Sequence, residues 1–182
     1  MINIFSSDFM PYGEIQANTI EKYRGKVPND LLKIWEQFGT GSIKNGYLKL
    51  INPDDYVNLL NISYFRSEVS IPIFTTSMCD IITFEENKYL RLVKYRKGNF
   101  SIIPTSFNLF FSDLLDEAFC SRHLDWAQYG EAVDKLGIPT YDDGFGYVPL
   151  LGLGGSVKAE NLQKVRIFEH IQLITELMGA IE

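Results

Sequence analysis

The sequence has few of the residues from which catalytic and metal centres are built. Its 182 residues include two histidines, His123 and His170, and two cysteines, Cys79 and Cys120. Only Cys120 and His123 are spaced like a pair of zinc ligands, and no second pair completes a site. Two cysteines also fall short of the disulfide framework of a small secreted domain, so we expect free thiols in a reducing cytosol.

Motifs of nucleotide-binding and hydrolytic enzymes are also missing. The glycine-rich run at 152–156 lacks the ending of a P-loop and the spacing of a dinucleotide loop, so we interpret its glycines as points of tight backbone geometry. Asp142 and Asp143 are adjacent, whereas the ligands of a calcium loop alternate. Cys120 and His123 leave a thiol–imidazole pair open, beside the simpler interpretation of a buried cysteine and a surface histidine. We expect no catalytic residue, cofactor or metal, and no enzymatic activity.

Long apolar runs and concentrated positive charge are absent too. The longest apolar stretch, Tyr147–Leu153, is far shorter than the roughly 20 residues that span a bilayer, and the N-terminal residues lack the features of a signal peptide. We therefore expect a cytoplasmic protein without membrane contact. The net charge of −6 argues against direct nucleic-acid binding and suits a basic protein partner. The basic residues between Lys88 and Lys97 are expected on a solvated strand face.

Hydrophobic patterning predicts an α+β protein, with N-terminal helices, a central antiparallel β-meander and C-terminal helices packed as one body. Helices are expected at 18–23, 28–38, 52–60, 106–119, 124–136 and 170–181. Strands are expected at 47–51, 71–75, 80–84, 89–95 and 100–103, where β-branched and aromatic residues are separated by short polar turns. A weak boundary near Pro104 divides the chain into residues 1–105 and 106–182.

Two sets of motifs resemble known domains. The first half contains Tyr12-Gly13, YRGKVP at 23–28, LLKIWEQFG at 31–39 and NPDDY at 52–56, and it resembles the GAD-like domain. The second half contains Tyr141-Asp142, GYVPLLGLGG at 146–155 and a closing hydrophobic helix. It resembles the C-terminal domain of type VI secretion immunity proteins that are paired with DNase effectors. The Pro28, Leu31-Leu32, Trp35 and Phe38-Gly39 pattern also resembles the broader SUKH group.

This resemblance implies an immunity protein that binds a cognate secreted toxin and blocks it in the producer's cytoplasm, with a DNase as the expected class of toxin. It implies no particular interface residues. Two alternatives stay open: a small hydrolase or nuclease with an unrecognised site, and a SUKH-like scaffold or regulatory binding module.

One loop has the composition of a protein interface. Tyr141, Asp142, Asp143, Phe145 and Tyr147 bring acidic and aromatic side chains together between glycines, and binding residues are frequent in such loops. We predict that these five residues bind the partner. For Phe145 and Tyr147 a core position is the alternative. Trp35 and Trp126 are expected in the core, because each lies at core spacing on a predicted helix.

Overall fold

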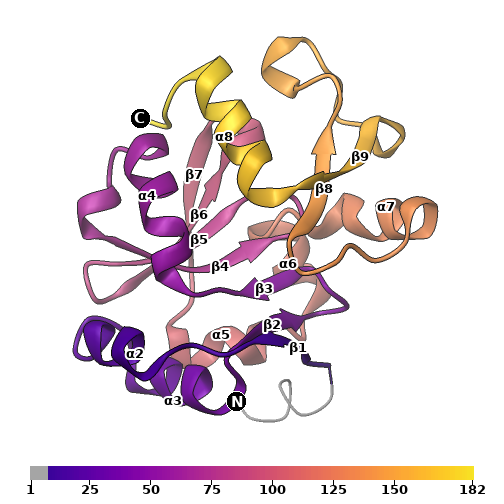
Figure 1. The fold of residues 1–182 in the computed structure, drawn as a ribbon. Helices are drawn as coiled ribbons and strands as arrows, with labels where there is room; N and C mark the ends of the chain where they lie inside the picture. Colours follow the sequence, from indigo (N-terminus) through magenta and orange to yellow (C-terminus); the bar gives the residue numbers. More distant parts are fainter. Residues whose placement is uncertain (1–7) are drawn as a thin grey trace.

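The computed structural model of the protein describes residues 8–182, so the residues used in the signal-peptide argument lie outside the described part. In that part, an antiparallel sheet of seven strands forms the centre, and its strand order follows the chain (Figure 1). The strands are β1 (Met10–Gly13), β2 (Thr40–Ile43), β3 (Leu48–Leu50), β4 (Ser70–Thr76), β5 (Ile81–Glu85), β6 (Tyr89–Lys94) and β7 (Asn99–Ile103). A separate antiparallel hairpin pairs β8 (Asp143–Tyr147) with β9 (Leu162–Arg166).

Helices interrupt and follow the strands of the sheet, which confirms the predicted α+β class. They are α2 (Ala17–Tyr23), α3 (Asn29–Phe38), α4 (Pro53–Ser63), α5 (Phe107–Asp113), α6 (Glu117–His123), α7 (Tyr129–Leu136) and α8 (Ile167–Met178). The start of α4 is the one that the sequence predicts. The Asn52 side chain accepts a hydrogen bond from the Asp54 backbone N–H at 3.1 Å, and Pro53 occupies the first turn.

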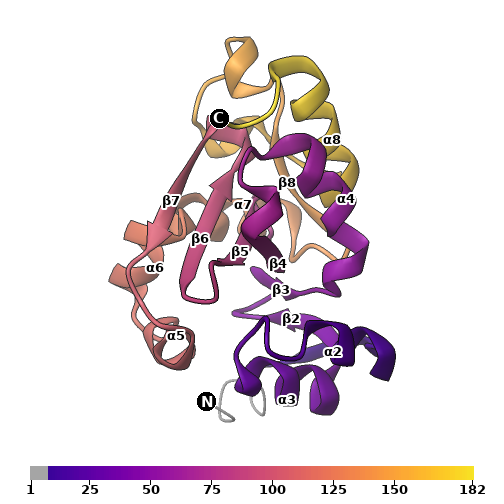
Figure 2. The ribbon, with the colours of Figure 1, turned by 90° about the vertical axis from the view of Figure 1, so that its left-hand side faces the viewer.

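Both faces of the sheet are covered by hydrophobic clusters. Leu90 and Leu92 of β6 belong to the larger cluster, which includes Trp35 of α3 and residues of α5. Val93 of β6 belongs to the second cluster, which contains residues of α4 and α8. Figure 2 shows α4 and α8 on one side of the sheet and α5 and α6 on the other. The strands of the meander therefore carry apolar side chains on both faces.

Two of the predicted helices are broken by aspartates. The helix expected at 106–119 divides into α5 and α6, because the Asp116 side chain accepts a hydrogen bond from the Ala118 N–H at 2.8 Å and caps a new helix. The helix expected from residue 124 begins at Tyr129 instead. Asp125 has a left-handed backbone with φ of 54°, so a regular helix cannot run through it.

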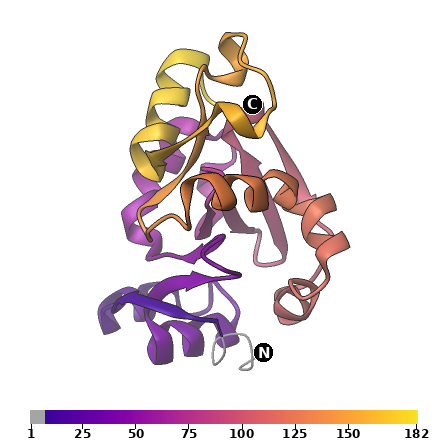
Figure 3. The same cartoon turned by 90° about the vertical axis from the view of Figure 1, so that its right-hand side faces the viewer.

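The second half of the chain packs directly over the sheet. The β8–β9 hairpin and α8 lie above α7 in Figure 3, and the backbone N–H of Phe145 donates to the Ser77 carbonyl in the β4–β5 turn at 2.6 Å. At the C-terminal end, the Phe65 N–H donates to the Ile181 carbonyl at 3.0 Å. The two halves thus form one body, as expected.

Candidate functional site

The segment Tyr141–Asp143, here called the 141–143 loop, leads into β8 and is held by the first half of the chain. The Tyr141 ring stacks on the Tyr12 ring of β1, with centroids 3.9 Å apart. The Tyr141 hydroxyl donates to the Leu50 carbonyl at 2.9 Å, and the Tyr12 hydroxyl donates to Asp142 Oδ2 at 2.9 Å. The loop is therefore attached to both β1 and β3.

The two carboxylates of the 141–143 loop share a single arginine. Arg166, at the end of β9, places its guanidinium 3.4 Å from Asp142 Oδ2 and 3.5 Å from Asp143 Oδ1. Thr140 Oγ1 also donates to Asp143 Oδ2 at 2.7 Å. Both carboxylates are partly exposed. One cation balances one of the two carboxylates, so this group of three charged side chains keeps a formal charge of −1.

A buried lysine supports the loop from below. Lys49 of β3 is fully buried, and its Nζ donates to the Thr140 carbonyl at 2.8 Å. Burial lowers the pKa of Lys49 from 10.5 to about 8, because the charged amine loses hydration, and the carboxylates of Asp143 and Asp142 oppose this shift. The lysine thus connects the centre of the sheet to the base of the loop.

The five predicted interface residues separate into two groups. Tyr141, Asp142 and Asp143 are partly exposed, whereas Phe145 and Tyr147 are 0 % and 2 % exposed. Phe145 packs against the ring of Tyr129, and the Tyr147 hydroxyl donates to the Gln128 side chain. For these two residues the structure shows the core alternative. Binding by the group remains a prediction, and in this conformation its accessible members are the three residues of the loop.

Sequence reasoning missed two exposed residues of this surface. Tyr12 is 58 % exposed and Arg166 is more than half exposed, and both contact Asp142. Tyr12 and Asp142 are separated by 130 residues in the sequence, so no local pattern connects them. The only signal in the sequence was composition, since Tyr12 is aromatic and the 141–143 loop is aromatic and acidic.

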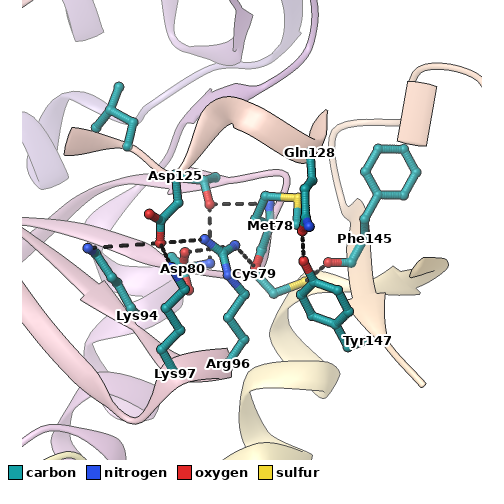
Figure 4. A network of polar contacts seen from close by, with 12 residues as sticks. Met78, Cys79, Asp80, Lys94, Arg96, Lys97, Asp125, Gln128, Phe145 and Tyr147 are labelled. Atoms are coloured by element: carbon teal, nitrogen blue, oxygen red, sulfur yellow. Dashed lines mark hydrogen bonds and ion pairs between the residues drawn. The ribbon is translucent and has the colours of Figure 1, made fainter. Parts of the chain in front are cut away.

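The basic residues around Arg96 form a buried network of ion pairs (Figure 4). Arg96 Nη1 lies 3.1 Å from Asp80 Oδ2, and Nη2 donates to Asp125 Oδ2 at 2.9 Å. Lys97 and Lys94 also approach Asp125, at 2.8 and 3.8 Å. The expectation of a solvated basic face fails for Arg96, which is buried and pairs with Asp80 in the β4–β5 turn and with Asp125 before α7. Lys88 and Lys97 are exposed, as expected.

Asp80 is the most deeply placed acid of this network, with no exposed surface. Although Arg96 lies within ion-pair distance, neither carboxylate oxygen accepts a hydrogen bond of good geometry from any residue in 8–182. Burial raises the pKa of Asp80 from 3.8 to about 6, and the charge of Arg96 opposes the shift. Asp125, whose backbone is left-handed, is held by ion pairs to Lys94, Arg96 and Lys97.

A groove of about 500 Å³ lies beside this network, between the β6–β7 turn, α8 and the loop after β8. Its lining includes Arg96, Tyr147, His170 and Met178. Exposed apolar side chains of Val148, Leu153, Val157 and Met178 occur on the same segments. The groove therefore combines apolar side chains with the charged guanidinium of Arg96.

The glycines of this loop shape its backbone, as the sequence predicts. Gly154 has φ of +91°, which favours glycine. A Cβ on Gly155 would lie 2.0 Å from the Pro149 carbonyl oxygen, and one on Gly152 would lie 2.3 Å from the Met178 methyl carbon. Close approach of chain segments thus accounts for the run of glycines.

The remaining candidates for chemistry occupy structural positions. Cys120 is buried and its thiol lies 3.4 Å from the Leu114 carbonyl, while the His123 ring packs on Phe119. Among residues 8–182, no three His, Cys, Asp or Glu side chains gather in a way that could hold a metal ion. Trp35 is in the core as expected, and Trp126 is partly buried against it.

No helix within residues 8–182 is both long and apolar enough to cross a bilayer.

Comparisons with known proteins agree with the two sets of motifs. Residues 3–89 match the family model of the GAD-like domain, and residues 105–178 match that of the T6SS immunity protein Tdi1, C-terminal. No curated protein matches the chain. The crystal structure of Atu4351 from Agrobacterium tumefaciens is similar, with a TM-score of 0.78, 13 % identity and coverage of 97 % of this chain and 89 % of that chain. At this identity the likeness shows a shared fold.

Proposed function

Because the chain belongs to the T6SS immunity proteins that join a GAD-like domain to the C-terminal domain of Tdi1, we propose that it binds a cognate secreted toxin and neutralises it. The protein acts by binding and not by catalysis. It works in the cytoplasm of the cell that produces the toxin, where an unblocked toxin would harm its own producer.

The observation that supports a binding surface is the junction of Tyr12, Tyr141 and Asp142. It joins the two matched segments and exposes aromatic and acidic groups. Lys49 fixes the start of the loop through its hydrogen bond to the Thr140 carbonyl. Rigid aromatic residues with polar neighbours supply much of the binding energy in protein interfaces. The toxin therefore contacts the 141–143 loop and Tyr12.

The proposed class of toxin is a nuclease. The net charge of −6 and the two carboxylates of the loop suit a partner with a positive surface, and nucleases bind phosphates through such surfaces. The 141–143 loop then faces the basic region of the toxin. Residues 1–105 and 106–182 act as the two domains of one binding unit, since the loop belongs to the second and Tyr12 to the first.

Co-expression tests this proposal. The product of the adjacent gene is expressed alone and together with this chain, and growth and co-purification are scored. We expect the chain to restore growth and to form a stable complex. Restored growth without a complex would contradict direct binding. If the chain neither restores growth nor forms a complex, the immunity function is rejected.

The same strains test the class of toxin. Genomic DNA and total RNA are extracted during toxin expression, with and without this chain. Degradation that the chain prevents supports a nuclease, and intact nucleic acids in cells that stop growing would reject it while leaving the immunity function in place.

A further inference from the structure

The two edge strands of the seven-stranded sheet differ in the features that hinder pairing with a further strand. The β1 edge has Pro11, which lacks an N–H, and its register with β2 shifts between Pro11 and Gly13. Both features discourage a further strand from pairing there. The β7 edge, Asn99–Ile103, has no proline and no charged residue, and its register with β6 is regular. It lacks the protections by which edge strands usually avoid association.

The outer side of β7 is open. Within the described residues, its backbone hydrogen bonds go to β6, apart from a turn in which the Thr105 N–H donates to the Ile103 carbonyl. Figure 2 shows β7 as the outermost strand of the sheet. A regular edge strand presents unpaired N–H and C=O groups on that side.

Apolar side chains accompany this open edge on the face covered by α4. Phe100 packs against Phe65 and Tyr64, with ring centroids 5.6 Å apart in both pairs. Phe65 is 55 % exposed, and Ile102, on the same face of β7 as Phe100, is 49 % exposed. The edge thus combines free backbone groups with an aromatic and aliphatic surface.

We propose that β7 pairs with β7 of a second copy of this chain, antiparallel and centred on Ser101, so that two sheets become one continuous sheet. This register places Phe100 opposite Ile102 of the second copy, twice and on one face. Aromatic and β-branched residues are favourable cross-strand partners. The contact is isologous, which is the commonest arrangement in homodimers.

Local charge favours a second copy over the toxin at this edge. The neighbouring cations Arg66, Arg91 and Lys97 are each paired with acids of the same chain, so among residues 8–182 this edge offers a basic toxin no unpaired carboxylate to bind. The strand itself is uncharged, and two copies of it bring no like charges into the ladder. The two-fold register also directs Lys97 toward the end of the partner strand, beyond which Asp113 lies near Thr105.

The dimer leaves the proposed toxin surface free. Tyr12 belongs to β1, at the opposite edge of the sheet from β7, with five strands between them. Each copy in the dimer therefore keeps its own 141–143 loop, and the complex with toxin has two copies of each protein.

Sedimentation velocity of the full chain, without toxin, tests the proposal across a concentration series. The test variant is Ile102→Glu, and Met10→Glu is its matched control, because Met10 is 44 % exposed on the other edge strand. We expect wild type and Met10→Glu to reach twice the monomer mass of 20.9 kDa. Ile102→Glu should raise the dimer dissociation constant at least about tenfold, because it places a carboxylate against Phe100 of the second copy. Circular dichroism checks that each variant is folded.

Three results would overturn the proposal: wild type that stays monomeric throughout the series, Ile102→Glu that dimerises like wild type, or Met10→Glu that dissociates equally. Hydrogen exchange gives a second measurement that needs no variant. Amides of Asn99–Ile103 should become protected as concentration rises, and protection independent of concentration would contradict pairing. Neither measurement uses the toxin, so each decides the dimer separately from the immunity function.

Discussion

Tyr12 and Tyr141 are stacked with an angle of 14° between their rings, although one belongs to β1 and the other to the loop before β8. The Tyr12 hydroxyl also reaches past its partner ring to Asp142. The conformation of the acidic loop therefore depends on a residue of the GAD-like segment. A binding surface built in this way needs both matched segments in one folded body.

Replacing Tyr12 by alanine should loosen the 141–143 loop. The stack is worth about 0.5–1.5 kcal/mol, and the exposure of Tyr12 places the expected loss of unfolding free energy in the lower part of this range. Toxin affinity should fall as well, because the loop loses a partner ring and a hydrogen bond. Urea denaturation and calorimetric titration with the co-purified toxin measure the two effects. Tyr12→Phe keeps the ring and serves as control; equal losses in both variants would assign the effect to the hydroxyl alone.

Reversing the charge of the loop should weaken toxin binding. In the double variant Asp142→Lys/Asp143→Lys, two lysines stand beside Arg166 and face a basic partner, so association should slow and affinity should fall more than about tenfold. The fold should persist, since exposed ion pairs contribute about 0–1 kcal/mol. Surface plasmon resonance at two salt concentrations measures the change.

The control for this variant is Glu131→Lys/Glu160→Lys, which alters net charge equally at exposed positions elsewhere. Wild-type affinity in the charge-reversed loop would remove the 141–143 loop from the interface. An equal loss in both double variants would indicate that overall charge, and not this loop, governs association.

The central meander could be predicted from sequence because its strands are local. β4 to β7 carry β-branched and aromatic residues, are joined by short turns and pair with their neighbours in the chain. The same holds for α3 and α4, whose Pro28 and Asn52 mark their starts. In these elements the side-chain pattern and the final burial agree.

The strands that sequence reasoning missed have compositions unlike a typical strand, and β1 and β8 also pair with segments farther along the chain. β2 and β8 contain glycines and β9 is largely polar, so their composition favours turns or exposed segments. β8 becomes a strand by pairing with β9 across the intervening loop. The candidate site shows the same limit, since the acids of the loop were identified but Tyr12 and Arg166 were not.

The buried carboxylate of Asp80 should lower stability as pH rises. Its folded pKa, about 6, exceeds its ordinary value of 3.8, so within this window the folded state holds a proton that the unfolded state has released. The unfolding free energy therefore falls through the window. Asp80→Asn should remove this contribution, and the difference between wild-type and variant curves should slope between these pH values. Asp134→Asn, at an exposed position, is the control; a flat difference curve for Asp80→Asn would contradict the assignment.

Lys49 should have the opposite signature at high pH. Its folded pKa, about 8, lies below its ordinary 10.5, so between these values the unfolded state holds a proton that the folded state has lost. The unfolding free energy should therefore rise across this window. Lys49→Met should remove the rise, and Lys33→Met, at an exposed helix position, should keep it. Denaturation curves at a series of pH values decide the matter, and an unchanged rise in Lys49→Met would exclude this lysine as its source.

Two glycines should respond to alanine with opposite signs. At Gly155 a Cβ would meet the Pro149 and Leu150 carbonyl oxygens at 2.0 and 2.9 Å, and backbone atoms of a tight turn cannot move aside without opening it. Gly155→Ala should therefore cost about 1–3 kcal/mol and alter the groove beside α8. Gly130 lies in α7 with no atom within 4 Å of the added carbon, so Gly130→Ala should stabilise by about 0.5–1 kcal/mol. Thermal denaturation measures both changes, and a neutral Gly155→Ala would show that the loop after β8 relaxes freely and that its glycines do not define its shape.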